Sequence, residues 1–306
     1  MSQWVVKNVC DASEAFNFGA GLIGANLNPL PTGFHSWDAA CMETDGKGIP
    51  QVYYVIIGGA SNAGKTQCLN HLLRQAMDFD MNPGLITMEV PIHGIQRSLY
   101  SQVTSFGFGD LLPAKFEDGD ASEKTVRLAE EVSRWADGRR ELIVAEHDGA
   151  PSIYDIVDMC YALKEAGCAV IGIDHLQLIK ASPGEIADRA TEVSEELRRF
   201  AHKEKITVIA LSQLNRLASR ERSRVPIKED LNGGTALEAN ANQIVMLDHT
   251  THIRDEMNPA RLRTRLILDK NRVGVARVAM LVEADFAKGV WREALPDEEH
   301  LWRAED

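Results

Sequence analysis

The most informative segment of the chain reads VYYVIIGGASNAGKT over residues 52–66. Its apolar, β-branched beginning is typical of a buried strand, and from Gly59 it continues as G-x-x-x-x-G-K-T. In such a loop the glycines let successive backbone N–H groups face an anion, Lys65 adds a positive charge and the Thr66 hydroxyl can hold Mg²⁺. Helical spacing follows, so a helix N-terminus would face the same anion. We therefore predict a nucleoside triphosphate site formed by Gly59, Ala60, Ser61, Asn62, Ala63, Gly64, Lys65, Thr66 and Gln67.

The composition is that of a large globular protein. With 306 residues and 44% hydrophobic content, the chain can bury a sizeable core. No apolar run approaches the roughly 18 residues of a membrane span, and the start lacks a signal-peptide profile, so we expect a cytoplasmic protein without membrane contact. Five scattered cysteines without CxxC pairs favour reduced thiols over disulfides or zinc. The net charge of −12 argues against nonspecific coating of duplex DNA, but not against nucleic acid held by backbone amides in a narrow channel.

Apolar runs alternate with helical patterns along most of the chain. Strands are expected at 53–57, 84–88, 142–145, 169–173 and 207–211, with helices between them at 66–78, 91–105, 121–137, 152–166 and 186–204. This alternation predicts an α/β domain with a mostly parallel central sheet flanked by helices. Further strands at 243–248, 261–269 and 277–283 predict a carboxyl-terminal β-hairpin. We expect one domain over 31–295 and an acidic tail over 296–306, and residues 1–30 form either an arm on a neighbouring subunit or a frayed terminus.

Three polar residues follow apolar runs at the expected carboxyl ends of strands. Asp174 is placed there as the acid that, with Thr66, would hold Mg²⁺. Glu89 could act as general base on the attacking water, although acids at strand ends are common. Gln213 could sense a γ-phosphate by hydrogen bonding or be a plain polar strand end. The sequence alone leaves the roles of Glu89 and Gln213 open.

A basic pair, Lys270 and Arg272, follows a late apolar run and precedes Gly274. Cationic side chains there could neutralise charge in the transition state of phosphoryl transfer. They lie far in sequence from the phosphate loop, so a neighbouring subunit is a plausible target. A solvated basic turn is the alternative.

In chain order, these segments resemble the ATPase domain of DnaB-type hexameric replicative helicases. The similarity covers about residues 30–290, and its motifs are PTGF (31–34) with WD (37–38), the phosphate loop, TMEVP (87–91), DHLQL (174–178), RATEVSEEL (189–197), SQLNR (212–216), DL (230–231) and KNRVG (270–274). The combination is specific, whereas the phosphate loop alone would not be.

The resemblance implies a RecA-like P-loop NTPase fold, with ATP and Mg²⁺ as cofactors. It implies that Glu89 is the catalytic base, that Asp174 is the magnesium-linked acid and that Gln213 couples the γ-phosphate to DNA-binding loops. Lys270 and Arg272 would reach across a subunit interface, with Arg272 as the arginine finger. The implied assembly is a ring, usually of six subunits, with single-stranded DNA through its centre and a primase or helicase loader as further partners.

The segment that aligns with the family's DNA-binding loop carries Asn232 where the family usually has arginine. We predict DNA contacts from Asn232, Gly233, Gly234, Thr235 and Arg216, because glycines allow backbone amides to approach phosphates closely. A basic stretch could line the channel or form a solvated loop. Its members are Arg216, Arg220, Arg222, Arg224 and Lys228.

The sequence therefore predicts an ATP-dependent, ring-shaped DNA helicase that moves along single-stranded DNA and separates strands during replication. We expect no amino-terminal domain before the ATPase, which suits a phage or plasmid element in a bacterial host. A RadA-like recombination or branch-migration ATPase is one alternative. A nucleotide-dependent oligomeric scaffold without helicase activity is another.

Overall fold

The computed structural model describes residues 28–116, 121–147, 149–180, 186–221, 223–254 and 260–294. The predicted arm, apart from residues 28–30, and the predicted acidic tail lie outside the described residues. Among the described helices, none is both long and apolar enough to cross a membrane.

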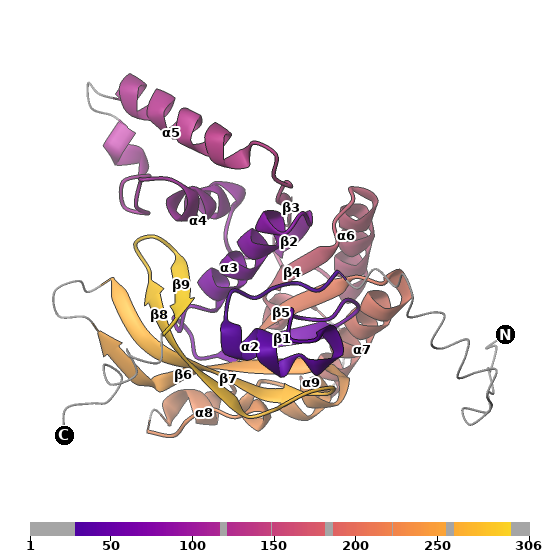
Figure 1. Ribbon diagram of the computed structural model, residues 1–306. Coiled ribbons are helices and arrows are strands. Elements are labelled where there is room, and N and C mark those ends of the chain that lie inside the picture. Colours follow the sequence, from indigo (N-terminus) through magenta and orange to yellow (C-terminus); the bar gives the residue numbers. More distant parts are fainter. Residues whose placement is uncertain are drawn as a thin grey trace.

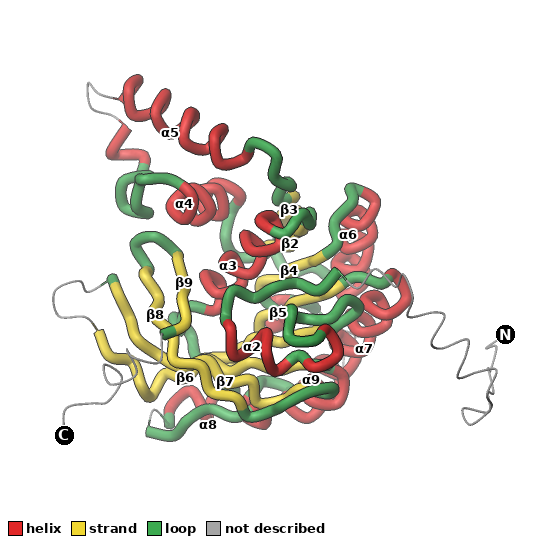
Figure 2. The backbone as a smooth tube through the Cα atoms, in the orientation of Figure 1, coloured by secondary structure: helices red, strands yellow, loops and turns green. Residues whose placement is uncertain are grey.

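A single nine-stranded sheet forms the centre of the molecule, with strand order β3-β2-β4-β5-β1-β6-β7-β8-β9 (Figures 1 and 2). The strands from β3 to β6 in this order pair in parallel, and β7, β8 and β9 continue the sheet as antiparallel neighbours. The bounds are β1 Tyr54–Gly59, β2 Pro83–Thr87, β3 Ile143–Glu146, β4 Val170–Asp174, β5 Thr207–Gln213, β6 Gln243–Arg254, β7 Arg261–Asn271, β8 Val278–Asp285 and β9 Val290–Glu293. The mostly parallel sheet and the antiparallel carboxyl-terminal strands are as predicted.

The helices occupy the connections where helical spacing was expected. They are α2 His35–Ala40, α3 Lys65–Asp78, α4 Ile92–Val103, α5 Ala121–Ala136, α6 Ile153–Glu165, α7 Ile186–Glu204, α8 Arg216–Arg220 and α9 Gly234–Asn240. Short 3-10 helices lie at Met42–Thr44, Pro113–Phe116, Leu176–Leu178 and Lys228–Asp230. The sequence did not predict α2, α8, α9 or β9. The segment 230–237, expected as a loop, contains the first half of α9.

Alternate residues of the strands face two separate cores, as the period of two in a strand requires. Val55 and Ile57 of β1 pack with α2 and α3 on one face of the sheet. Tyr54 and Ile56 pack with α6, α7 and α9 on the other face. All six residues of β1 are buried because helices cover both sides of it. Helices α4 and α5 stand apart from the sheet, next to each other (Figure 1).

The register of the strands defines two edges of the sheet. At the phosphate edge, the carboxyl ends of β1, β2, β4 and β5 lie together, with Gly59 beside Gln213 and Thr87 beside Asp174. At the far edge, Gln243 at the start of β6 pairs with Val55 near the start of β1. Ligands of open parallel sheets bind outside the carboxyl ends of the strands. The phosphate edge is therefore where a site is expected.

Candidate active site

The turn between β1 and α3 forms one wall of an open pocket of about 370 Å³ at the phosphate edge. Asn62 and Gly64 adopt left-handed backbone conformations in this turn, with φ of 63° and 93°. A Cβ atom on Gly64 would lie 3.0 Å from ring carbons of Phe286 and of Trp291, so both the backbone angle and the packing require glycine there. The pocket is lined by Ser61, Asn62, Gly64, Lys65, Thr66, Gln67, Glu89, Val90, Asp174, His175, Gln213 and Phe286.

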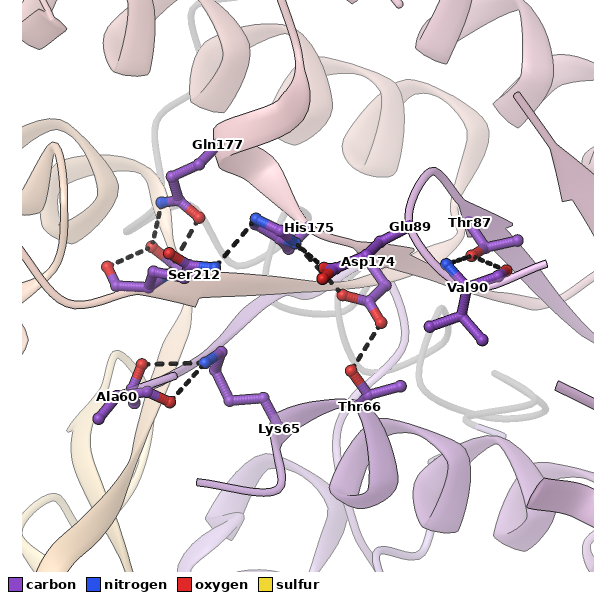
Figure 3. Close-up of polar contacts among 12 residues, drawn as sticks. Ala60, Lys65, Thr66, Thr87, Glu89, Val90, Asp174, His175, Gln177 and Ser212 are labelled. Carbon is purple, nitrogen blue, oxygen red and sulfur yellow. Dashed lines mark hydrogen bonds and ion pairs between the residues drawn. The ribbon is translucent and has the colours of Figure 1, made fainter. Parts of the chain in front are cut away.

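Lys65 is a buried cation within this turn (Figure 3). Its Nζ donates to the backbone oxygens of Gly59 at 3.0 Å and Ala60 at 2.7 Å. Burial lowers the pKa of Lys65, and the nearby charges of Asp174 and Glu89 oppose that shift. An ammonium held this way gains most from an anion that enters the pocket, because no carboxylate is in direct hydrogen-bond contact with it among the described residues.

Thr66 and Asp174 meet beside Lys65. The Thr66 hydroxyl donates to Asp174 Oδ2 at 2.7 Å, and Asp174 is only 3% exposed. A hydroxyl and a carboxylate are the hard oxygen ligands that Mg²⁺ prefers. Next to them, Oε1 of Gln67 is buried without a hydrogen-bond partner among the described residues. These donors fit a Mg²⁺–nucleotide, with Thr66 and Asp174 on the cation and the Lys65 turn on the phosphates.

Glu89 reaches the pocket from the end of β2, and 63% of its side chain is exposed. Its Oε2 lies 3.3 Å from Nδ1 of the buried His175, and His175 Nε2 lies 3.2 Å from the Gln213 side-chain nitrogen (Figure 3). An amide nitrogen can only donate, so His175 Nε2 accepts and Nδ1 carries the proton that points to Glu89. Gln213 is therefore connected to Glu89 through one imidazole ring.

Sequence reasoning did not single out His175, Gln177 or Phe286. Gln177 accepts from the Gln213 backbone N–H at 3.0 Å and donates to Ser212 Oγ at 2.9 Å. The available signal for His175 and Gln177 was their position in DHLQL, directly after Asp174. Phe286 enters from the turn between β8 and β9, and no local pattern links that turn to the phosphate loop.

The residues predicted to contact DNA are split between two places. The backbone N–H of Asn232 donates to the Gln213 backbone oxygen at 2.9 Å, so Asn232 lies directly behind the phosphate edge. Gly233 has φ of 86°, and a Cβ there would lie 2.3 Å from that of Ala190. Gly234 is buried at the start of α9, whereas Thr235 in its first turn is exposed. Arg216 is exposed at the start of α8 and does not line the pocket.

Part of the basic stretch is neutralised within the chain. Arg224 bonds to Asp230 at 2.6 Å and lies 3.4 Å from Glu221, and Lys228 pairs with Glu229 at 2.9 Å. Arg220 is exposed at the end of α8. Arg222 lies outside the described residues.

Lys270 and Arg272 are the predicted residues that the structure keeps away from the pocket. Asn271, between them, pairs with Gln243 at the far edge, about 13 Å along β1 from Gly59. Lys270 Nζ donates to the Glu238 backbone oxygen, and Arg272 Nη2 donates to that of Ala239 at 3.1 Å. These carbonyl groups end α9, where the helix dipole favours cations. Neither side chain can complete the pocket of its own chain from this position.

The family model for the DnaB-like helicase C terminal domain matches residues 29–289. The chain belongs to this family. Its fold is likewise that of solved DnaB ATPase domains, and the predicted RecA-like fold is confirmed. One solved structure, of an isolated ATPase domain, superposes with a TM-score of 0.72 at 19% identity, over 95% of this chain and 100% of that one. A DnaB-like replicative helicase, described with its interactions with primase, gives 0.70 at 20% identity over 93% and 68%.

Curated DnaB proteins are similar in sequence over much of this chain. The replicative DNA helicase DnaB of Geobacillus stearothermophilus is 25% identical over 267 residues, which is 84% of this chain and 56% of that protein. The DnaB of Helicobacter pylori strain J99 is 26% identical over 225 residues, or 71% and 43%. A probable plasmid replicative DNA helicase of Chlamydia muridarum is 26% identical over 250 residues, or 80% and 51%. The chain thus spans about half the length of the curated relatives it matches.

Proposed function

We propose that this DnaB-family chain is the ATP-hydrolysing subunit of a ring-shaped helicase that translocates on single-stranded DNA and unwinds duplex during replication. The observation that carries the proposal is the separation of Lys270 and Arg272 from the phosphate pocket by the length of β1. A pocket at one edge and a cationic pair at the other form complete sites only when protomers associate head to tail. Such heterologous contacts generate rings when the rotation closes.

The pocket residues divide the chemistry among them. The backbone N–H groups of the β1–α3 turn and Lys65 bind the phosphates, and Thr66 and Asp174 hold Mg²⁺, which supplies charge stabilisation to the transferring phosphoryl group. Glu89 is the general base that takes a proton from the attacking water. Its orientation is supported by the Nδ1 proton of His175.

The cationic pair supplies what each pocket lacks. Arg272 of one protomer enters the pocket of its neighbour as an arginine finger, with Lys270 beside it, and stabilises charge in the transition state. Such a contribution is worth about 10³–10⁵ in rate. Within one chain, both side chains rest on carbonyl groups at the end of α9, and assembly would exchange these contacts for the neighbour's phosphates.

DNA contact is proposed at Asn232, Gly233, Gly234 and Thr235, with Arg216 nearby in sequence after β5. The support is the hydrogen bond from Asn232 N–H to the Gln213 backbone oxygen, which joins this turn to the pocket. A shift of the turn on single-stranded DNA would move Gln213 and, through His175, Glu89. A primase or a loader is a proposed further partner, in a bacterial cytoplasm. The similarity to a plasmid helicase supports an origin on a phage or plasmid.

The test is Arg272→Ala in the assembled protein. We expect the variant to bind ATP and form rings but to lose about 10³-fold in DNA-stimulated hydrolysis. Arg140→Ala, which removes an exposed arginine paired with Asp80, is the matched control and should hydrolyse normally. Rings of Arg272→Ala that hydrolyse ATP at the normal rate would refute the trans contact. Fork unwinding separates a helicase from a RadA-like strand-exchange enzyme, and turnover insensitive to single-stranded DNA would indicate a scaffold.

A further inference from the structure

Asn271 is buried between two residues that are not. It is 9% exposed, whereas Arg272 is exposed and Lys270 is half-buried. Successive side chains of a strand point to opposite faces. Whatever holds Asn271 inward therefore directs Lys270 and Arg272 to the other face.

The side-chain amide of Asn271 is fully used. Its Nδ2 donates to the backbone oxygens of Ala40 at 2.9 Å and Val275 at 3.2 Å. Its Oδ1 accepts from Gln243 Nε2 at 3.2 Å. The Ala40 oxygen also accepts from the Val275 N–H at 3.2 Å. One amide thus closes the turn 271–275 and ties it to the end of α2.

The chain of buried polar groups continues inward. Gln243 is 0% exposed, and its Oε1 accepts from the indole N–H of Trp37 at 3.1 Å. Because the indole can only donate, it fixes which end of the Gln243 amide faces Asn271. Gly274 has φ of 141°, and a Cβ there would lie 2.2 Å from the Ala40 oxygen, so the turn packs directly on α2. Trp37 belongs to the PTGF–WD segment, to which the proposed chemistry assigns no role.

We propose that Asn271 is a positioning residue of the composite site. Through Gln243 and Trp37 it fixes the turn from which Lys270 and Arg272 reach the pocket of the next protomer. The inference rests on the proposed trans contact and adds to it a residue that touches neither nucleotide nor water. A satisfied buried amide chain is suited to this task because any misplaced member leaves a polar group without a partner.

Asn271→Asp tests the proposal with little change in shape. The carboxylate cannot donate, and it faces the Ala40 and Val275 oxygens that the amide served. We expect DNA-stimulated kcat to fall tenfold or more, with the KM for ATP unchanged because each protomer's own pocket lies at the other edge. Asn82→Asp is the matched control. Its Oδ1 accepts from the Glu141 N–H at 3.2 Å, which a carboxylate also does, and we expect normal turnover.

Mixed rings distinguish positioning in trans from general damage. Lys65→Ala protomers have no working pocket but keep a normal turn 271–275. Co-assembled with Asn271→Asp protomers at equal ratio, they should raise hydrolysis above that of either variant alone. The limit is about a quarter of the wild-type rate if interfaces form at random and act independently. Should Asn271→Asp fail to form rings, Asn271→Ala is measured in the same way.

Arg272→Ala mixed with Lys65→Ala is run in parallel. Rescue of both Arg272→Ala and Asn271→Asp supports the proposal. Rescue of Arg272→Ala without rescue of Asn271→Asp overturns the role of Asn271 and leaves the trans contact standing. Failure to rescue Arg272→Ala overturns the trans contact, and the role of Asn271 falls with it. Normal turnover of Asn271→Asp on its own also overturns that role.

Discussion

Replacing Thr66 by valine removes one hydroxyl that is expected to change partners when Mg²⁺–nucleotide binds. In the structure it donates to the buried Asp174 carboxylate at 2.7 Å. A hydrogen bond to a charged group contributes about 1.5–3 kcal/mol, and the partial exposure of Thr66 places this one near about 1.5 kcal/mol. At the sensitivity of a domain of this size, Thr66→Val should lower Tm by about 3 °C without nucleotide. Valine keeps the β-branched shape, so little else changes.

With nucleotide present, the same substitution removes a proposed Mg²⁺ ligand. Binding of a fluorescent ATP analogue is compared with Mg²⁺ and with EDTA, and the gain that Mg²⁺ gives should shrink about tenfold, equivalent to about 1.4 kcal/mol. Thr66→Ser keeps the hydroxyl and should restore both the melting temperature and the Mg²⁺ dependence. A Thr66→Val protein that melts like the wild type and keeps its Mg²⁺ dependence would refute this assignment of the hydroxyl.

Three further predictions concern stability and DNA. Burial, reinforced by the charge of Arg74, lowers the pKa of His71 to about 3. The unfolded chain therefore binds a proton below about pH 6.5 that the folded chain refuses, and stability falls by about 1.4 kcal/mol per pH unit there; His71→Gln should flatten this loss in urea unfolding between about pH 6.5 and pH 5. Gly64→Ala should destabilise by about 1–3 kcal/mol through its left-handed φ and its aromatic neighbours, whereas Gly109→Ala, which meets nothing within 4 Å, should be near neutral in thermal melts; equal melting temperatures would count against it. Asn232→Arg should tighten single-stranded DNA binding and steepen its log–log salt dependence by about 0.7, measured by fluorescence anisotropy, and an unchanged slope would place Asn232 off the DNA.

The main features of the sheet could be predicted because buried parallel strands leave a strong mark on sequence. Runs such as Tyr54–Gly59 are apolar on both faces, and helical spacing separates them. Short elements leave no such mark. Helix α9 begins at Gly234 after a left-handed Gly233, which local chemistry assigns to a turn, and it is held by packing of the buried Leu237. β9 has only four residues, and its pairing with β8 sets it.

The membership of the pocket followed from topology. Lys65, Thr66, Glu89, Asp174 and Gln213 line one pocket because parallel strands bring their carboxyl ends to one edge. Side-chain connections within the pocket could not be predicted in this way. The place of His175 between Glu89 and Gln213 depends on ring orientation, and that of Phe286 depends on how the β8–β9 turn folds back.

The dependence of ATP turnover on protein concentration examines the shared site without any substitution. Turnover per protomer is measured with single-stranded DNA across a dilution series, and light scattering at each concentration reports the fraction in rings. If Arg272 of each protomer serves its neighbour, turnover rises in proportion to the ring fraction and is near zero for isolated protomers. Full turnover by isolated protomers would contradict the shared site.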